Sequence, residues 1–140
     1  MKILFAADGS KYTKKALAYL VTHAHLAGPE HQIVVLNVQG PIPPEVKRMV
    51  GAGAVKKYHD DEADKVLKPI GRFLERHTTQ FRMKSVVGNP SQEIVKASKT
   101  EKANLIIMGT RGHGVVGRAL LGSVAQRVLT ECDMPVLLVK

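Results

Sequence analysis

Short apolar runs rich in β-branched residues alternate along the chain with longer segments whose apolar residues recur at helical spacing. The run IVVLNV at 33–38 shows almost no polar alternation, which is what burial of both faces of a strand requires. Such runs separated by helices predict a parallel sheet covered on both faces, because each return to a parallel strand needs a helical crossover. The predicted strands are residues 3–7, 33–38, 83–87, 105–108 and 136–139.

Two of the helical segments are marked by their apolar periodicity. In the first, apolar residues recur at helical spacing over 16–24 and stop before Gly28. In the second, which follows a Pro-rich loop, they recur over 66–74. Pro69 lies inside this second segment and predicts a kink in its helix.

Two further helices are marked by capping signals. Asn89 is an expected N-cap, with Pro90 at the first helical position and Gln92 placed to complete a capping box. Ser123 and Gln126 form a second capping box, S-x-x-Q. We therefore expect a helix to start at Ser123, with free amide donors and a partial positive charge at its N-terminus.

Length and composition indicate one globular domain over residues 1–140. A chain of 140 residues with 44% hydrophobic and 24% charged residues has enough apolar material for a single packed core. The N-terminal apolar run breaks at Asp8 and is too short for a signal peptide or a membrane span, so we expect a cytoplasmic protein without a membrane partner. Cys132 is the only cysteine, which agrees with a reducing compartment.

The net charge of +9 raises the question of nucleic-acid binding. The excess of basic residues is spread evenly along the chain and forms no tail or block. Three Tyr, three Phe and no Trp also offer little aromatic surface for stacking bases. We therefore expect no dedicated nucleic-acid binding, and a basic surface that favours anionic small ligands.

The stretch GHGVVG at 112–117 comes close to two nucleotide-binding motifs. Its glycines fit the G-x-G-x-x-G of dinucleotide-binding turns, but the next strand ends at Lys140 and not at an acidic residue that holds a ribose. Compared with the phosphate-binding loop, Arg118 replaces the lysine and Ala119 replaces the hydroxyl that binds magnesium. Neither motif is satisfied.

A wider window fits an anion site better. Gly109 and Gly112 follow a predicted strand, and Gly122-Ser123 precedes a predicted helix whose N-terminus is a ready site for an anion. Capping by Ser123 alone needs no ligand. The density of glycines indicates backbone that approaches something closely or adopts positive φ, with a merely mobile loop as the alternative.

Gly109, Gly112, Gly122 and Ser123 match the signature G-x2-G-x9-G-[ST] at every spacing. In this window the chain resembles the ATP-binding branch of the universal stress protein family, and the likeness extends over nearly its whole length. The resemblance implies a Rossmann-like α/β fold, with a single-domain open five-stranded parallel sheet in the order 3-2-1-4-5 and helices on both faces. In that order the chain reverses direction between strands 1 and 4, where an open α/β sheet leaves a crevice for ligands.

The resemblance also implies a ligand and its contacts. The ligand is ATP, or ADP or AMP, with any Mg²⁺ held through the phosphates. Arg111 is added as a phosphate contact because of its charge and reach, while His113 is equally a phosphate contact or a solvated loop residue. The positions similar to those that hold adenine and ribose are Ala7, Asp8 and Val38; those that close over the nucleoside are Met108 and Gly109; those that donate to the phosphates are Gly112, Gly122, Ser123 and Val124.

The leading hypothesis is a stress-response regulator that binds an adenine nucleotide and is no enzyme, or at most a very slow ATPase. Beyond Asp8 and His113 the loops offer no base or lysine clamp, so no catalytic residue is predicted. No metal site is predicted either, because His23 and His25 are expected on opposite faces of a helix and the acidic run 60–64 suits a helix's first turn. The alternative is a stress-linked interaction module with an empty or vestigial pocket.

The final strand, 136–139, predicts a homodimer. In the implied order it lies at an edge of the sheet, where unpaired backbone groups invite another chain. A two-fold axis there pairs the strand with its own copy, antiparallel, in a closed interface. A monomer whose edge is covered by Lys140 or a neighbouring loop is the alternative, and a signalling partner is expected in either case.

Overall fold

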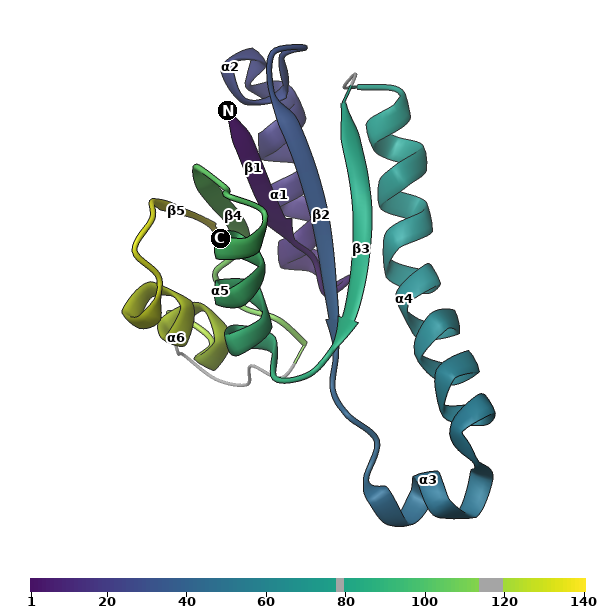
Figure 1. The fold of residues 1–140 in the computed structure, drawn as a ribbon. Helices are drawn as coiled ribbons and strands as arrows, with labels where there is room; N and C mark the ends of the chain where they lie inside the picture. Colours follow the sequence, from purple (N-terminus) through teal and green to yellow (C-terminus); the bar gives the residue numbers. More distant parts are fainter. Residues whose placement is uncertain (78–79, 114–119) are drawn as a thin grey trace.

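Five parallel strands form one open sheet (Figure 1). They are β1 (Lys2–Ala6), β2 (Gln32–Gln39), β3 (Phe81–Val87), β4 (Leu105–Gly109) and β5 (Val136–Val139). The computed structural model describes residues 1–77, 80–113 and 120–140. The strand order is β3-β2-β1-β4-β5, and every neighbouring pair is parallel. Both the predicted fold class and the predicted order are therefore confirmed.

Helices cover both faces of this sheet, as the strand pattern predicts. The described helices are α1 (Lys11–Thr22), α2 (Ala24–Ala27), α3 (Pro44–Val50), α4 (Ala52–Glu75), α5 (Pro90–Thr100) and α6 (Ser123–Glu131). Helices α1, α2 and α4 pack on one face, while α5 and α6 pack on the other (Figure 1). Because all strands run the same way, their carboxyl ends meet at one edge of the sheet, and the loops that follow them meet there too.

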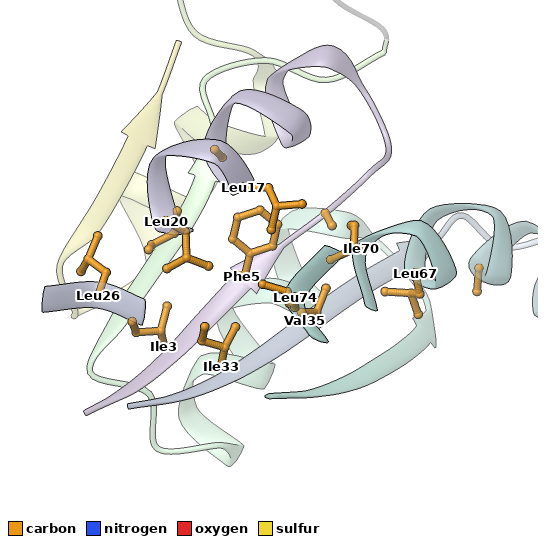
Figure 2. Close-up of a cluster of buried hydrophobic side chains, with 14 residues drawn as sticks. Ile3, Phe5, Leu17, Leu20, Leu26, Ile33, Val35, Leu67, Ile70 and Leu74 are labelled. Atoms are coloured by element: carbon orange, nitrogen blue, oxygen red, sulfur yellow. The ribbon is translucent and has the colours of Figure 1, made fainter. Parts of the chain in front are cut away.

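The central strand β1 divides the core into two layers. Successive side chains of a strand point to opposite faces, so Ile3 and Phe5 enter one layer while Leu4 enters the other. All three of these side chains are fully buried. Figure 2 shows the first layer, in which Phe5 lies between the leucines of α1 and Leu74 of α4. Burial on both faces is the reason that the sequences of β1 and β2 lack polar alternation.

The predicted helix over 16–24 is interrupted at His23. Helix α1 ends at Thr22, and His23 has an extended backbone with φ −113° and ψ 96° before α2 begins. The rings of His23 and His25 consequently pack edge to face, with centroids 5.7 Å apart. The expectation that these histidines face opposite sides of a helix is wrong, because the helix breaks between them.

The segment after β2 also differs from its prediction. The Pro-rich loop leads into the short helix α3, and α4 starts at Ala52, so the acidic run 60–64 lies in the middle of a helix and not in its first turn. The carboxylates of Asp60 and Asp61 accept hydrogen bonds from Lys56 (2.6 Å) and Lys57 (2.8 Å), one helical turn earlier. These pairs explain the acidic run as the solvated face of a helix, with each carboxylate partnered.

Glu101 links the end of α5 to the sheet. Its side chain is 11% exposed and lies 3.9 Å from Nζ of Lys2 in β1 and 3.7 Å from Nζ of Lys84 in β3. Arg82, also in β3, donates a hydrogen bond to its carboxylate. Burial acts to raise the pKa of Glu101, but the hydrogen bond from Arg82 and the charges of Arg82, Lys84 and Lys2 outweigh it and hold the pKa below its ordinary value.

We expect Glu101→Gln to weaken the fold in a pH-dependent way. A carboxyl whose pKa is lowered by folding stabilises the folded state above its unfolded pKa of about 4.5, and this contribution is lost as the pH falls through the lower folded value. The variant should therefore lose about 1–2 kcal/mol of unfolding free energy at neutral pH and progressively less in acid. Urea unfolding across the acid range measures this difference.

Glu75→Gln is the matched control for this experiment, because Glu75 is an exposed carboxylate at the end of α4. Its loss should change stability little at any pH. A destabilisation by Glu101→Gln that persists unchanged in acid would contradict the ion-pair account.

Candidate functional site

The loop between β1 and α1 holds a carboxylate in a fixed position. Oδ1 of Asp8 accepts hydrogen bonds from the backbone N–H of Ser10 (2.9 Å) and the hydroxyl of Thr13 (2.8 Å). The hydroxyl oxygen of Thr13 in turn accepts from the N–H of Asp8 (3.0 Å). Ser10 caps α1 through its side chain, which accepts from the N–H of Thr13. Asp8 is thereby placed at the carboxyl end of the central strand, with Oδ2 directed at the loop that follows β4.

The loop after β4 lies directly against the loop between β1 and α1, because the glycines at this contact have no side chains. A methyl group on Gly109 would lie 2.5 Å from Cβ of Tyr12, and one on Gly112 would overlap Oδ2 of Asp8. Nε2 of His113 also donates to the backbone carbonyl of Asp8 (2.8 Å). The close approach predicted from the glycine density is confirmed at these two positions. The backbone there approaches the loop between β1 and α1 and the first turn of α1.

The same loop ends at the N-terminus of α6. The predicted cap is wrong by one residue: Gly122 is the N-cap, its carbonyl accepts from the N–H of Gln126 (3.0 Å), and Ser123 is the first helical residue. The extended backbone of Gly122 is tied back to β4, because its N–H donates to the carbonyl of Thr110 (2.7 Å). The helix begins without a side-chain cap, so its first amides and the exposed hydroxyl of Ser123 face outward.

Thr110 carries the least satisfied polar group of this region. Its side chain is buried, with 6% of the residue exposed, and within the described part of the chain its hydroxyl has no hydrogen-bond partner. Its backbone is fully used, since the N–H donates to the carbonyl of Val139 (2.9 Å) and the carbonyl accepts from Gly122. A buried hydroxyl left without a partner costs free energy, which a bound ligand can recover.

These features line one cavity of about 280 Å³ at the carboxyl edge of the sheet, between β1 and β4. Every residue of the predicted site lies on its wall: Ala7, Asp8, Val38, Met108, Gly109, Arg111, Gly112, Gly122, Ser123 and Val124. The structure brings them together from three separate stretches of sequence. Their roles toward a ligand stay a prediction.

The wall also contains residues that the sequence did not single out. They are Ala6, Thr13, Leu36, Pro90, Ile94, Thr110 and Ala125. The aliphatic members come from strand ends and from α5 and α6, while the two threonines add hydroxyls. Thr110 directly follows Gly109 and was accessible to sequence reasoning, whereas Thr13 and Ile94 read as ordinary positions of helices and are revealed only by the packing.

The wall combines two kinds of surface. Leu36, Ile94 and Met108 give an apolar surface suited to a flat ring. The loops add the carboxylate of Asp8, the guanidinium of Arg111 and the amides of α6. Such a cavity suits a ligand that has an apolar ring, hydroxyl groups and an anionic end.

In residues 1–77, 80–113 and 120–140, no three His, Cys, Asp or Glu side chains gather in a way that could hold a metal ion. No helix there is both long and apolar enough to cross a membrane.

Comparison with known proteins gives a consistent family. A model described as "Universal stress protein family" matches residues 1–140. A Thermus aquaticus protein named "Universal stress protein in QAH/OAS sulfhydrylase 3'region" is 35% identical over 138 residues, which are 99% of this chain and 97% of the relative. The solved structure of MJ0577, a universal stress protein of Methanocaldococcus jannaschii, superposes with a TM-score of 0.86 at 29% identity and covers 99% of this chain and 94% of its own.

Three solved structures that share the fold contain adenine nucleotides. An Archaeoglobus fulgidus universal stress protein in complex with dAMP has a TM-score of 0.69 at 23% identity, covering 100% of this chain and 98% of its own. A universal stress protein in complex with cAMP has a TM-score of 0.68 at 21% identity, with 99% and 95% covered. An Arabidopsis thaliana family protein with AMP bound has a TM-score of 0.71 at 18% identity, with 100% and 91% covered. At these identities the likeness extends to the fold alone.

The two loop glycines are expected to respond differently to an added methyl group. Gly109→Ala drives a methyl into Cβ and the backbone of Tyr12, which are fixed in α1, so we expect it to cost about 1–3 kcal/mol of unfolding free energy. Gly112→Ala meets only the end of the Asp8 side chain and no backbone of that loop, and moving the carboxylate disturbs only its hydrogen bonds from Ser10 and Thr13, so its cost should be smaller. Thermal or urea unfolding of both variants measures the difference.

Gly40→Ala is the control, because a methyl group there has open space around it. Equal stability of the Gly109→Ala and Gly40→Ala variants would contradict the close packing of the two loops.

Proposed function

This chain belongs to the universal stress protein family, and on that premise we propose that it is a stress-response protein that binds an adenine nucleotide in the cavity between β1 and β4. The ligand is ATP, or ADP or AMP, with any Mg²⁺ held through the phosphates. One observation carries the proposal: the buried hydroxyl of Thr110, which has no hydrogen-bond partner among the described residues, lies in the same cavity as a helix N-terminus that has no side-chain cap. Both are groups that a phosphorylated ligand would satisfy.

The phosphates would bind at the start of α6. The amides of Ser123, Val124 and the next residue have no intrahelical acceptor, and the helix dipole adds partial positive charge at this end. Gly122 lets the phosphate approach this backbone without a side chain in the way. Arg111 lines the same cavity and can add a charge-assisted hydrogen bond.

The base would bind at the end of β2. The N–H of Ala7 donates to the carbonyl of Leu36 (2.8 Å), so Leu36 and Val38, two residues apart, both direct their backbone groups toward β1. Because β1 ends at Ala6, the backbone of Val38 extends past the last residue of its neighbour. Its N–H and carbonyl can therefore meet the polar edge of an adenine, while Asp8 accepts from the ribose hydroxyls.

Binding without efficient catalysis is the function that these contacts favour. Oδ1 of Asp8 already accepts two hydrogen bonds, and Nε2 of His113 is committed to the Asp8 carbonyl. His113 is therefore not free to activate a water, and Oδ2 of Asp8 is the oxygen that would accept from the ribose, so we propose a regulator with no hydrolysis or only slow hydrolysis. Its cytoplasmic location and its signalling partner are part of the same proposal. The second candidate is an interaction module whose cavity stays empty.

A homodimer through β5 completes the proposal. The carbonyls of Pro135 and Val139 accept from the N–H groups of Ile106 in β4 and of Thr110 just after it, so alternate residues along β5 direct their backbone groups toward β4. Val136 and Leu138 accordingly direct their backbone groups to the free edge of the sheet. These groups can pair with the same strand of a second copy around a two-fold axis.

Thr110→Val tests the nucleotide site. It replaces the buried hydroxyl with a methyl of similar shape, so we expect the ligand-free protein to be as stable as the unmodified one or slightly more stable. Affinity for ATP should fall about tenfold, the worth of one lost hydrogen bond of about 1.4 kcal/mol. Calorimetric titration with ATP, ADP and AMP gives the affinities, and thermal unfolding gives the stability.

Gly122→Val gives the stronger form of the same experiment. The φ of −73° at Gly122 suits any residue, so the fold should survive while the side chain blocks the start of α6 and abolishes ATP binding. Gly40→Val, at an exposed position with open space, is the control. No nucleotide binding by the unmodified protein would favour the interaction module, and unchanged binding by a folded Gly122→Val variant would exclude this phosphate site.

Leu138→Pro tests the dimer. Proline removes an N–H that faces the free edge and leaves the inward pairing with β4 in place, so we expect a dimer to become a monomer. Light scattering should give about twice the chain mass of 15.3 kDa for the unmodified protein and about that mass for the variant. Leu138→Ala keeps the N–H and should stay dimeric; a monomeric unmodified protein would refute the proposal.

A further inference from the structure

Three cationic side chains gather around one aromatic ring beside the cavity. Nζ of Lys11 lies 5.3 Å from the ring centroid of Tyr12, Nζ of Lys15 lies 5.6 Å from it and Cζ of Arg111 lies 5.9 Å from it. Nη1 of Arg111 also donates to the hydroxyl of Tyr12 (3.4 Å). We call Lys11, Lys15 and Arg111 the Tyr12 cluster.

The Tyr12 cluster lacks the acidic partners that other lysines of the protein have. In the described part of the chain, no carboxylate lies within ion-pair distance of any of its three members. On α4, by contrast, Lys56 and Lys57 each contact an aspartate one turn away. Within the described residues, the positive charge of the Tyr12 cluster is therefore not balanced by an ion pair.

Its position on α1 makes this charge unfavourable in the ligand-free protein. Lys11 and Lys15 are one helical turn apart, where like charges repel. Both lie near the N-terminus of α1, whose first turn contains no acidic residue and whose dipole already places partial positive charge there. An anion bound beside Tyr12 would relieve both effects.

Arg111 connects the Tyr12 cluster to the cavity. It lines the cavity wall and contacts Tyr12 at the same time. Tyr12 in turn packs on Gly109, at the point where the loop leaves β4. An anionic chain that starts at the amides of α6 and passes Arg111 would therefore reach Lys11 and Lys15 next.

We propose that the Tyr12 cluster binds the outer phosphates of the nucleotide and thereby makes the site prefer a triphosphate over a monophosphate. This inference rests on the proposed nucleotide site. The phosphate nearest the ribose is held by α6 and is common to AMP, ADP and ATP, so it does not distinguish them. Only the added phosphates extend to Lys11 and Lys15, and the attraction there is between exposed charges and is weakened by salt.

The double variant Lys11→Gln/Lys15→Gln tests the proposal by calorimetry with ATP and AMP at low and high salt. We expect its affinity for ATP to fall about tenfold, as two exposed charge contacts are lost, and its affinity for AMP to change less than about twofold. The preference of the unmodified protein for ATP over AMP should shrink as salt is added, and that of the variant should respond less.

Lys14→Gln/Lys99→Gln is the matched control, because it removes the same charge from exposed lysines outside the Tyr12 cluster. It should keep the ATP preference of the unmodified protein. An equal loss in the control would show a general effect of net charge and would overturn the proposal. An unchanged ratio of ATP to AMP affinity in the double variant would also overturn the proposal, and would favour an acidic partner protein as the ligand of the Tyr12 cluster. Binding of neither nucleotide by the unmodified protein would overturn the proposed function itself.

Discussion

The reversal of strand order at the centre of the sheet is the constraint on which the rest of this structure depends. The chain adds β2 and β3 on one side of β1 and then β4 and β5 on the other, so the loops after β1 and β4 leave the sheet side by side. Side chains at Gly109 and Gly112 would collide with Tyr12 and Asp8, on the other side of this contact. The absence of these two Cβ atoms allows the close contact that forms one wall of the cavity.

The same contact accounts for the character of the proposed site. His113 joins the two loops by donating to the backbone carbonyl of Asp8, while Oδ1 of Asp8 accepts two hydrogen bonds from the start of α1 and the residues before it. In the described part of the chain, the cavity groups without a side-chain partner include the hydroxyl of Thr110 and the first amides of α6, which are suited to holding a ligand and not to performing chemistry. A fold that uses its candidate bases for structure and leaves its donors open is suited to sensing a nucleotide.

Within the described residues, some charges are balanced by ion pairs and others are not. Glu101 is surrounded by cations from β1 and β3, and the lysines of α4 alternate with carboxylates. The lysines at the start of α1 have no such partners in the described part of the chain. The net charge of +9 is spread evenly along the sequence. In the folded chain, however, three of the cations gather in the Tyr12 cluster beside the cavity.

The sequence by itself determined the strands and the layer architecture, because periodicity and the Asn89 cap are local signals. The predicted site residues, which line the cavity, came from the resemblance of the sequence to a known family and from the charge of Arg111. Only the tertiary structure decided the break at His23, the cap at Gly122 and the place of the acidic run within α4. It also decided that the hydroxyl of Thr110 has no hydrogen-bond partner in the described part of the chain and that Arg111 meets Tyr12, which is 99 residues away in the sequence. Such contacts depend on how distant loops pack against one another, and no pattern within a single segment encodes that.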